Sequence, residues 1–251
     1  RINENPYLDN QLKQLEMQFN ATKQRLGNKF GTKKFIVYFQ SFTNTYAPIS
    51  TLKALYEKAL SFDNVIGLSI GTRTDCVTEE ILDYLVDLSK TKEIWVEYGI
   101  QSFYDETLVR VNRGDSVSNM KHWIKRTKEK GLNVCGHLIY GLPDETQEMM
   151  LETFRQTVEL NVDSIKFHPL YVVENTLLTN EFKKGKFTPI SEELYIDTVV
   201  KSIVNLPSNI SVQRITAGID DSTLLSPEWC RDKHTQMKNI RLALEKEGFN
   251  Y

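Results

Sequence analysis

The chain has 251 residues, with 31 Lys and Arg residues against 33 Asp and Glu residues, which gives a formal net charge of −2. A hydrophobic share of 40% and a charged share of 25% are ordinary for a globular protein that buries its core without disulfides. The near-neutral charge argues against a wholly basic nucleic-acid binder, and the sequence has no apolar run long enough for a membrane span.

The three cysteines are odd in number and far apart, at Cys76, Cys135 and Cys230. This usage predicts a reducing, cytoplasmic environment and small buried thiols, because neither a disulfide framework nor a metal knuckle fits the spacing. The chain begins at Arg1 and not at methionine, so we expect that a preceding segment has been removed or processed.

Hydrophobic periodicity predicts short β-rich runs that alternate with longer amphipathic stretches, after a first helical face at Leu8–Leu26. The predicted strands are Phe35–Phe39, Val65–Ile70, Ile94–Ile100, Asn133–Tyr140 and Ser164–Phe167, with a further short run at Ile210–Gln213. The predicted helices are Ser50–Leu60, Glu79–Leu88, Tyr104–Val111, Ser118–Lys130, Glu145–Leu160, Leu177–Lys184, Glu192–Val204 and Asp232–Glu247. Ser50 and Thr78 are the expected N-caps, and Gly131 is expected to end a helix.

Strand–helix repeats of this length indicate parallel βαβ units in a single α/β domain over residues 1–251. Within it we expect an N-terminal helix over 1–30, the βα units over 31–190 and a C-terminal helical extension over 191–251. The repeats suit either a doubly wound sheet or a closed or partly closed barrel. No glycine-rich dinucleotide motif or Walker lysine is present, so the sequence does not support nucleotide binding by those routes.

Polar residues stand at the ends of the predicted strands, where barrel enzymes keep their active sites. They are Gln40, Ser41, Thr43 and Asn44, then Thr72 to Asp75, then Gln101 and Ser102, and finally His137, Gly141 and His168. We expect Arg73, Gln101, His137 and His168 to open into one cavity. Capping and turn formation would explain each cluster singly, but five clusters in succession less well.

Several tracts resemble radical SAM enzymes close to the catalytic subunit of Elongator. Trp95-Val-Glu-Tyr-Gly-Ile-Gln-Ser102 carries this resemblance, and His137-Leu-Ile-Tyr-Gly-Leu-Pro143 resembles a strand of oxygen-independent coproporphyrinogen oxidase. Tyr38-Phe-Gln-Ser-Phe-Thr-Asn-Thr-Tyr-Ala-Pro48 and Gly67-Leu-Ser-Ile-Gly-Thr-Arg73 resemble a stand-alone bacterial and archaeal group, the YhcC-like proteins. The resemblance covers about Phe35 to Trp229.

The resemblance implies a partial (β/α)6 barrel of the radical SAM type that lacks its first strand and its cluster loop in this chain. It also implies two cofactors, S-adenosylmethionine and a [4Fe–4S] cluster held by three cysteine thiolates. None of the three cysteines present matches a cluster position, so the cluster cysteines are expected upstream of Arg1. The full-length protein is then expected to be an enzyme, and this cluster-free chain to be inactive alone.

The same resemblance implies functional residues at the matching positions. The expected cofactor contacts are Gln40, Ser41, Thr43, Arg73, Glu97, Gln101, Ser102, Arg113, His137 and Gly141; the expected substrate contacts are Lys166, His168 and Tyr171. Lys166 and His168 alternate along a strand and therefore share a face. Plainer interpretations stay open, among them an ion pair between Arg73 and Asp75, a turn at Gln101 and Ser102, a helix end at Arg113 and a core position for His137.

The resemblance makes transfer RNA, of the wobble-uridine class, the leading substrate, and flavodoxin or ferredoxin the expected electron donor. No membrane partner is expected, and the sequence does not predict the oligomeric state. Two alternatives remain: a metabolic barrel lyase or aldolase with Lys166 as Schiff-base former, and a non-catalytic scaffold that lacks the cluster.

Overall fold

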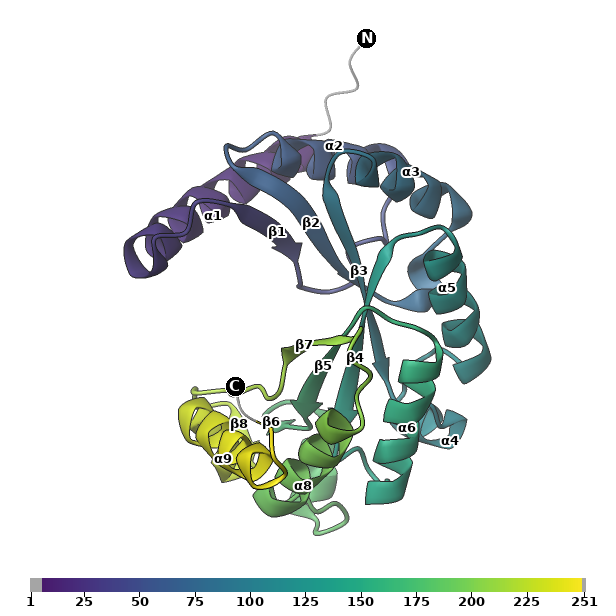
Figure 1. The fold of residues 1–251 in the computed structure, drawn as a ribbon, viewed down its shortest axis with the longest axis vertical. Helices are drawn as coiled ribbons and strands as arrows, with labels where there is room; N and C mark the ends of the chain where they lie inside the picture. The colour runs from purple at the N-terminus through teal and green to yellow at the C-terminus, as the bar shows by residue number, and fades with distance from the viewer. Residues whose placement is uncertain (1–5, 250–251) are drawn as a thin grey trace. The chain divides into compact units, whose positions relative to one another are not determined.

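The computed structural model describes residues 6–249, which form two compact units. Unit 1 comprises the described residues up to Glu97 together with Arg126–Asn133, and unit 2 comprises Tyr98–Lys125 and the described residues from Val134 onward. Figure 1 labels the helices and strands of both units.

Unit 1 holds the first helices and strands. They are α1 (Pro6–Phe30), β1 (Phe35–Phe39), α2 (Ile49–Leu60), β2 (Val65–Thr72), the 3₁₀ turn η1 (Thr74–Cys76), α3 (Glu79–Ser89) and β3 (Glu93–Gln101) as far as Glu97. β1 pairs in parallel with β2, with Tyr38 opposite Ser69. Helix α1 packs against α2, and α2 packs against β2 (Figure 1).

Unit 2 holds the end of β3 and most of the remaining elements. They are α4 (Asp105–Arg110), the first part of α5 (Val117–Glu129), β4 (Asn133–Tyr140), α6 (Gln147–Glu159), β5 (Ser164–Pro169), β6 (Val172–Val173), α7 (Leu177–Lys183), α8 (Glu192–Val204), β7 (Ser211–Arg214), β8 (Leu224–Ser226), η2 (Glu228–Arg231) and α9 (Lys233–Lys246). Helix α8 packs against both α6 and α9 (Figure 1), and β6 pairs with β8 in a small antiparallel sheet.

The main sheet has the sequential order β1-β2-β3-β4-β5-β7. Its pairs β1–β2, β4–β5 and β5–β7 are parallel. A doubly wound sheet reverses its strand order in the middle, so this order excludes that alternative. The five predicted strands are confirmed, and the short run Ile210–Gln213 is the sixth strand, β7, one residue out of register.

Two of the three predicted helix caps are confirmed and one is wrong. The hydroxyl of Thr78 accepts a hydrogen bond from the Ile81 amide, as an N-cap does, and Gly131 adopts a left-handed φ of +79° just after α5. Ser50 is not an N-cap, because α2 begins at Ile49 after Pro48. Proline with its fixed φ favours the helix start, so the N-cap is Pro48, two residues earlier than the predicted Ser50 cap.

The two faces of β4 and β5 are packed differently. Tyr140 and Phe167 lie on one face, where Phe167 contacts Phe154 of α6 and Tyr140 contacts Tyr195 of α8, with ring centroids 6.3 and 6.2 Å apart. Residues on this face are fully buried. Of the alternate residues, His137, Ile139 and His168 are half-buried, so the polar face is the one that faces away from α6 and α8.

Among the described residues, no helix is long and apolar enough to cross a membrane.

Candidate functional site

In unit 1, the loop after β1 is fastened to the ends of β1 and β2 by Asn44. Its side-chain amide donates to the carbonyl oxygens of Phe39 at 3.0 Å and Gly71 at 2.9 Å. Its own carbonyl accepts from the hydroxyl of Tyr56 at 2.5 Å. These bonds fix the path of the loop that carries Gln40, which is exposed.

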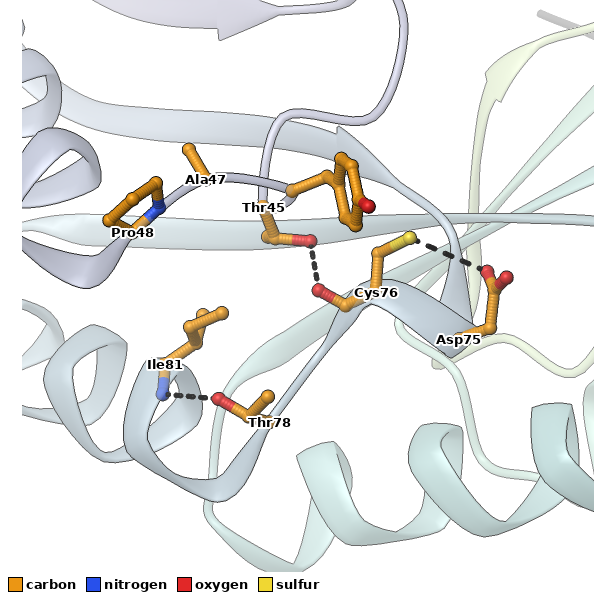
Figure 2. Close-up of a pocket in the computed structure, with 8 residues that line it drawn as sticks. Thr45, Ala47, Pro48, Asp75, Cys76, Thr78 and Ile81 are labelled. Carbon is orange, nitrogen blue, oxygen red and sulfur yellow. Dashed lines mark hydrogen bonds between the residues drawn. The ribbon is translucent and has the colours of Figure 1, made fainter.

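A cavity of about 440 Å³, the Thr45 pocket, lies where this loop meets the turn after β2. Its lining residues are Thr45, Tyr46, Ala47, Pro48, Asp75, Cys76, Thr78 and Ile81 (Figure 2). The Thr45 hydroxyl donates to the Cys76 carbonyl at 2.7 Å and shares a hydrogen bond with the Thr72 hydroxyl at 2.5 Å. The polar side chains of Thr45, Asp75 and Thr78 in this pocket therefore have hydrogen-bond partners within the chain.

The predicted cofactor contacts of unit 1 have these surroundings. Arg73 binds Asp75 through two bonds, Nε to Oδ1 at 2.8 Å and Nη2 to Oδ2 at 2.6 Å, which is the turn ion pair of the plainer interpretation. Ser41 is exposed and Thr43 half-buried. Phe42 between them is 99% exposed and has a φ of +62°, a strained conformation for a bulky side chain.

Glu97 is 2% exposed in the middle of β3 and accepts a hydrogen bond from the Ser69 hydroxyl. A buried carboxylate is costly without donors, and Ser69 supplies one. Glu97 is therefore held within unit 1 by the neighbouring strand.

In unit 2, a second cavity of about 450 Å³, the Tyr171 pocket, lies at the carboxyl ends of the strands. Its walls are Gln101, Arg110, Val111, Asn112, Ile139, Leu142, Pro143, Leu170, Tyr171, Thr176, Leu177, Leu178 and Glu181. Most of these side chains are apolar, with a few polar groups among them, which is the composition of a small-molecule site.

Two polar residues of this pocket have unusual features. Gln101 has a φ of +69°, which few residues other than glycine or asparagine adopt. The Tyr171 hydroxyl is buried and has no hydrogen-bond partner among residues 6–249. Strained backbone and unsatisfied buried polar groups gather at functional sites, so both features indicate a ligand.

Two other predicted contacts of unit 2, Ser102 and Arg113, have partners in the chain. Ser102 is fully buried and donates to Glu145, whose pKa is raised by burial. Arg113 donates from Nη2 to the Gly99 carbonyl at 2.6 Å. These contacts fix the turn after β3.

Gly141 ends β4 with a φ of +90°, and a Cβ there would lie 2.7 Å from Cγ2 of Ile190. The missing side chain therefore makes room for Ile190, while the following Leu142 and Pro143 line the Tyr171 pocket. Of Gln101, His137 and His168, which we expected to share a cavity, only Gln101 is among the lining residues.

The predicted substrate contacts lie on one face of β4 and β5. Lys166 is opposite His137 and His168 is opposite Ile139, a wall of the Tyr171 pocket. The His168 ring packs on the Tyr171 ring with centroids 4.7 Å apart. His168 Nδ1 donates to the Pro169 carbonyl at 2.6 Å, and burial, aided by nearby positive charge, lowers its pKa to about 4, so the imidazole is neutral at pH 7.

Sequence reasoning missed two residues with a role here. Asn44 was noted only as part of a polar cluster, although it fastens the loop after β1. Arg214 ends β7 and lies opposite Lys166. A polar residue at the carboxyl end of a strand is the pattern that would have identified Arg214. The predicted strand ended at Gln213, one residue before it.

The cysteines lie in different surroundings. Cys76 is partly exposed in the Thr45 pocket, whereas Cys135 and Cys230 are fully buried. Burial also raises the pKa of the Cys230 thiol to about 12.

Comparison with known proteins places this geometry in a family. Residues 11–157 match the radical SAM superfamily, and residues 162–246 match the Radical_SAM C-terminal domain. YhcC of Escherichia coli strain K12 is 36% identical, over 86% of this chain and 70% of YhcC. The tRNA uridine(34) acetyltransferase of Methanocaldococcus infernus is 30% identical, over 64% of this chain and 30% of that protein.

Among solved structures, the archaeal Methanocaldococcus infernus Elp3 with an N-terminal deletion superimposes with a TM-score of 0.79 at 24% identity, over 94% of this chain and 60% of that one. This likeness confirms the predicted fold class, a partial (β/α) barrel. The superfamily match spans more than half of the chain, and the similarity to YhcC covers 86% of the chain. The chain therefore belongs to the radical SAM superfamily, in the YhcC-like group related to the Elongator catalytic subunit.

Proposed function

We propose that the chain binds S-adenosylmethionine and forms the barrel of a radical SAM enzyme that modifies transfer RNA. Membership of the radical SAM superfamily supports this enzyme class over a lyase or aldolase. The M. infernus relative is named as a tRNA uridine(34) acetyltransferase, which supports transfer RNA as the substrate class. The observation that carries the proposal is the Tyr171 pocket, an apolar cavity with a strained glutamine at one strand end and an unsatisfied hydroxyl at another.

The adenosyl group is the part of the cofactor that suits this pocket. Ile139, Leu142 and Leu170 would pack against the adenine ring, and the Gln101 carboxamide would hydrogen-bond the ribose hydroxyls. When bound, the cofactor supplies the radical chemistry, while the residues of the chain bind it, orient it and exclude water. For the other predicted contacts, from Gln40 to His137, cofactor binding stays a prediction from the resemblance.

The three cysteines present do not fit an iron–sulfur cluster. Iron is ligated by thiolates, and two of the three thiols are fully buried, with the pKa of Cys230 raised far above neutral pH. We propose that thiolates other than Cys76, Cys135 and Cys230 hold the cluster in the full-length protein, and that flavodoxin or ferredoxin supplies the electron.

Cofactor binding is tested with the full-length protein, reconstituted anaerobically, by equilibrium dialysis of radiolabelled S-adenosylmethionine. Gln101→Ala is expected to weaken binding about ten-fold, which is the loss of one good hydrogen bond, and Gln11→Ala on the exposed face of α1 is the matched control. Leu178→Trp, which fills the pocket, is expected to abolish binding, whereas Leu194→Trp on α8 leaves it unchanged. Unchanged affinity in both pocket variants would refute this site.

The chemistry is tested by reducing the protein and measuring 5′-deoxyadenosine. The variants Cys76→Ser, Cys135→Ala and Cys230→Ala are each expected to keep the cluster absorbance. Loss of that absorbance in a folded single variant would contradict the cysteine argument. Cofactor binding without cleavage would favour the scaffold alternative.

The substrate class is tested by mass spectrometry of nucleosides from transfer RNA. Material from cells that lack the gene is compared with material from cells that carry the wild type or Gln101→Ala. A nucleoside that disappears without the gene and returns only with the wild type supports the proposal. Identical nucleoside profiles in all strains would refute it.

A further inference from the structure

A β-bulge at the end of the sheet brings Arg214 beside the predicted substrate residues. Ile165 of β5 lies opposite Val212 of β7, but the next residue, Lys166, lies opposite Arg214 and not Gln213. One extra residue on β7 therefore shifts the register, so the guanidinium comes from the strand position opposite Lys166. Bulges re-aim side chains in this way and are common next to active sites.

In the part of the chain that the structure describes, the guanidinium of Arg214 has no acceptor. Within the described residues its half-buried side chain makes neither an ion pair nor a hydrogen bond. A half-buried guanidinium is costly without an acceptor, and its planar fork suits a carboxylate or a phosphate. Arg214 is thus a donor that lacks its acceptor.

A second unpartnered donor lies close to the first. Among the described residues, the buried Tyr171 hydroxyl has no hydrogen-bond partner. Burial raises the pKa of Tyr171, and the positive charge of Arg214 opposes that rise. Arg214 also adds to the lowering of the pKa of His168, which burial causes in the main, and the His168 ring packs on Tyr171. Both electrostatic effects require Arg214 to be near this pair of rings.

We propose that Arg214 and the Tyr171 hydroxyl together bind an oxyanion of the substrate, a carboxylate or a phosphate, beside the Tyr171 pocket. The inference rests on the proposed function, because the substrate is that of the cofactor-dependent reaction. Tyr171 is a wall of the pocket proposed for the adenosyl group, whereas Arg214 is not. We therefore place the oxyanion beside that pocket and assign it to the substrate, and a parallel measurement of cofactor affinity distinguishes it from the methionine carboxylate.

The test is a titration of the unreduced full-length protein with sodium acetate and, separately, with inorganic phosphate. It is followed by NMR of histidine ring carbons labelled with ¹³C. The His168 resonance is expected to move, while those of the exposed His122 and His234 stay in place. Arg214→Gln is expected to weaken the response at least ten-fold, and Arg214→Lys by an intermediate factor because it keeps the charge without the fork. Arg241→Gln, an exposed arginine of α9, is the matched control.

A response to acetate alone assigns a carboxylate, and a response to phosphate alone or to both anions assigns a site that admits a phosphate. If neither anion moves the His168 resonance, or if folded Arg214→Gln responds like the wild type, the proposal is overturned. Affinity for S-adenosylmethionine is measured in parallel and is expected to stay within two-fold in Arg214→Gln. If Arg214→Gln loses affinity for the anion and for S-adenosylmethionine equally, the oxyanion belongs to the cofactor and the substrate assignment is overturned. If the wild type binds the anion but no S-adenosylmethionine, only the proposed function is overturned.

Discussion

The Thr45 pocket and the Tyr171 pocket are of similar size, but they differ in how their polar groups are satisfied. In the Thr45 pocket, the Thr45 hydroxyl binds Thr72 and the Cys76 carbonyl, and Asp75 binds Arg73. In the Tyr171 pocket, the one buried tyrosine hydroxyl has no partner among the described residues. The first arrangement needs nothing from outside, whereas the second is complete only with a ligand.

Whether a buried polar group has a hydrogen-bond partner within the chain distinguishes structural polar residues from those proposed to bind a ligand. Satisfied buried groups fix a loop at little net cost, and an unsatisfied buried group costs about 1–3 kcal/mol until a ligand supplies its partner. Position at a strand end does not distinguish the two cases, because both pockets lie there. The partners of each polar atom do.

The largest expected effect tests the packing of Ile190 against Gly141, the residue before Leu142 and Pro143 of the Tyr171 pocket. Gly141→Ala is expected to destabilise the protein by about 2–4 kcal/mol, since its Cβ would overlap Ile190 and its φ is left-handed. Gly185→Ala shares the left-handed φ but has no atom within 4 Å, so about 1 kcal/mol is expected there. Urea unfolding measures both, and equal losses would show that Ile190 yields.

The pH dependence of stability tests the neutral imidazole beside Tyr171. Because burial depresses the pKa of His168 from 6.5 to about 4, the unfolded chain binds a proton in this window that the folded chain does not. Stability should therefore fall by about 2–3 kcal/mol as the pH drops from 6.5 to 4. His168→Gln is expected to remove this part of the fall, and the exposed His234→Gln to leave it. Parallel pH profiles for the wild type and His168→Gln would contradict the buried neutral form.

A pair of hydroxyl deletions tests the comparison directly, because opposite signs are expected. Thr45→Val removes a satisfied hydroxyl and should cost about 1–2 kcal/mol of unfolding free energy. Tyr171→Phe removes an unsatisfied one and should raise the stability of the ligand-free protein by about 1 kcal/mol. Denaturant titration of both variants measures this, and destabilisation by Tyr171→Phe would mean that the hydroxyl has a partner.

The smallest expected effect concerns Arg73. Its side chain and that of Asp75 are each 31% exposed, so the ion pair is expected to contribute about 0–1 kcal/mol. Arg73→Ala should thus change the unfolding midpoint little. If the resemblance assigns Arg73 correctly, the affinity for S-adenosylmethionine falls ten- to a hundred-fold in the same variant, and dialysis separates the two roles.

The strands and their order could be predicted from the sequence because they are continuous apolar runs separated by helical periods. The ends of the strands can be predicted too, and Gln101 is a candidate for that reason, whereas Tyr171 is one as an aromatic side chain on which a base of transfer RNA could stack. What each polar atom binds could not be predicted, since the bond from Thr45 to Cys76 spans 31 residues. The bulge that brings Arg214 opposite Lys166 has no sequence signature, because it depends on pairing between β5 and β7.

The ion pairs of Arg110 have a consequence for the kinetics of ligand exchange. Helix α7 forms one wall of the Tyr171 pocket, and its Glu181 accepts from Arg110 Nη1 at 3.1 Å, while Arg110 Nε binds Asp144 at 3.2 Å. These charges are partly or largely exposed, and added salt weakens exposed ion pairs. Salt is therefore expected to loosen this wall without touching the ligand, so that ionic strength changes the rates of entry and release together and leaves the equilibrium affinity nearly constant.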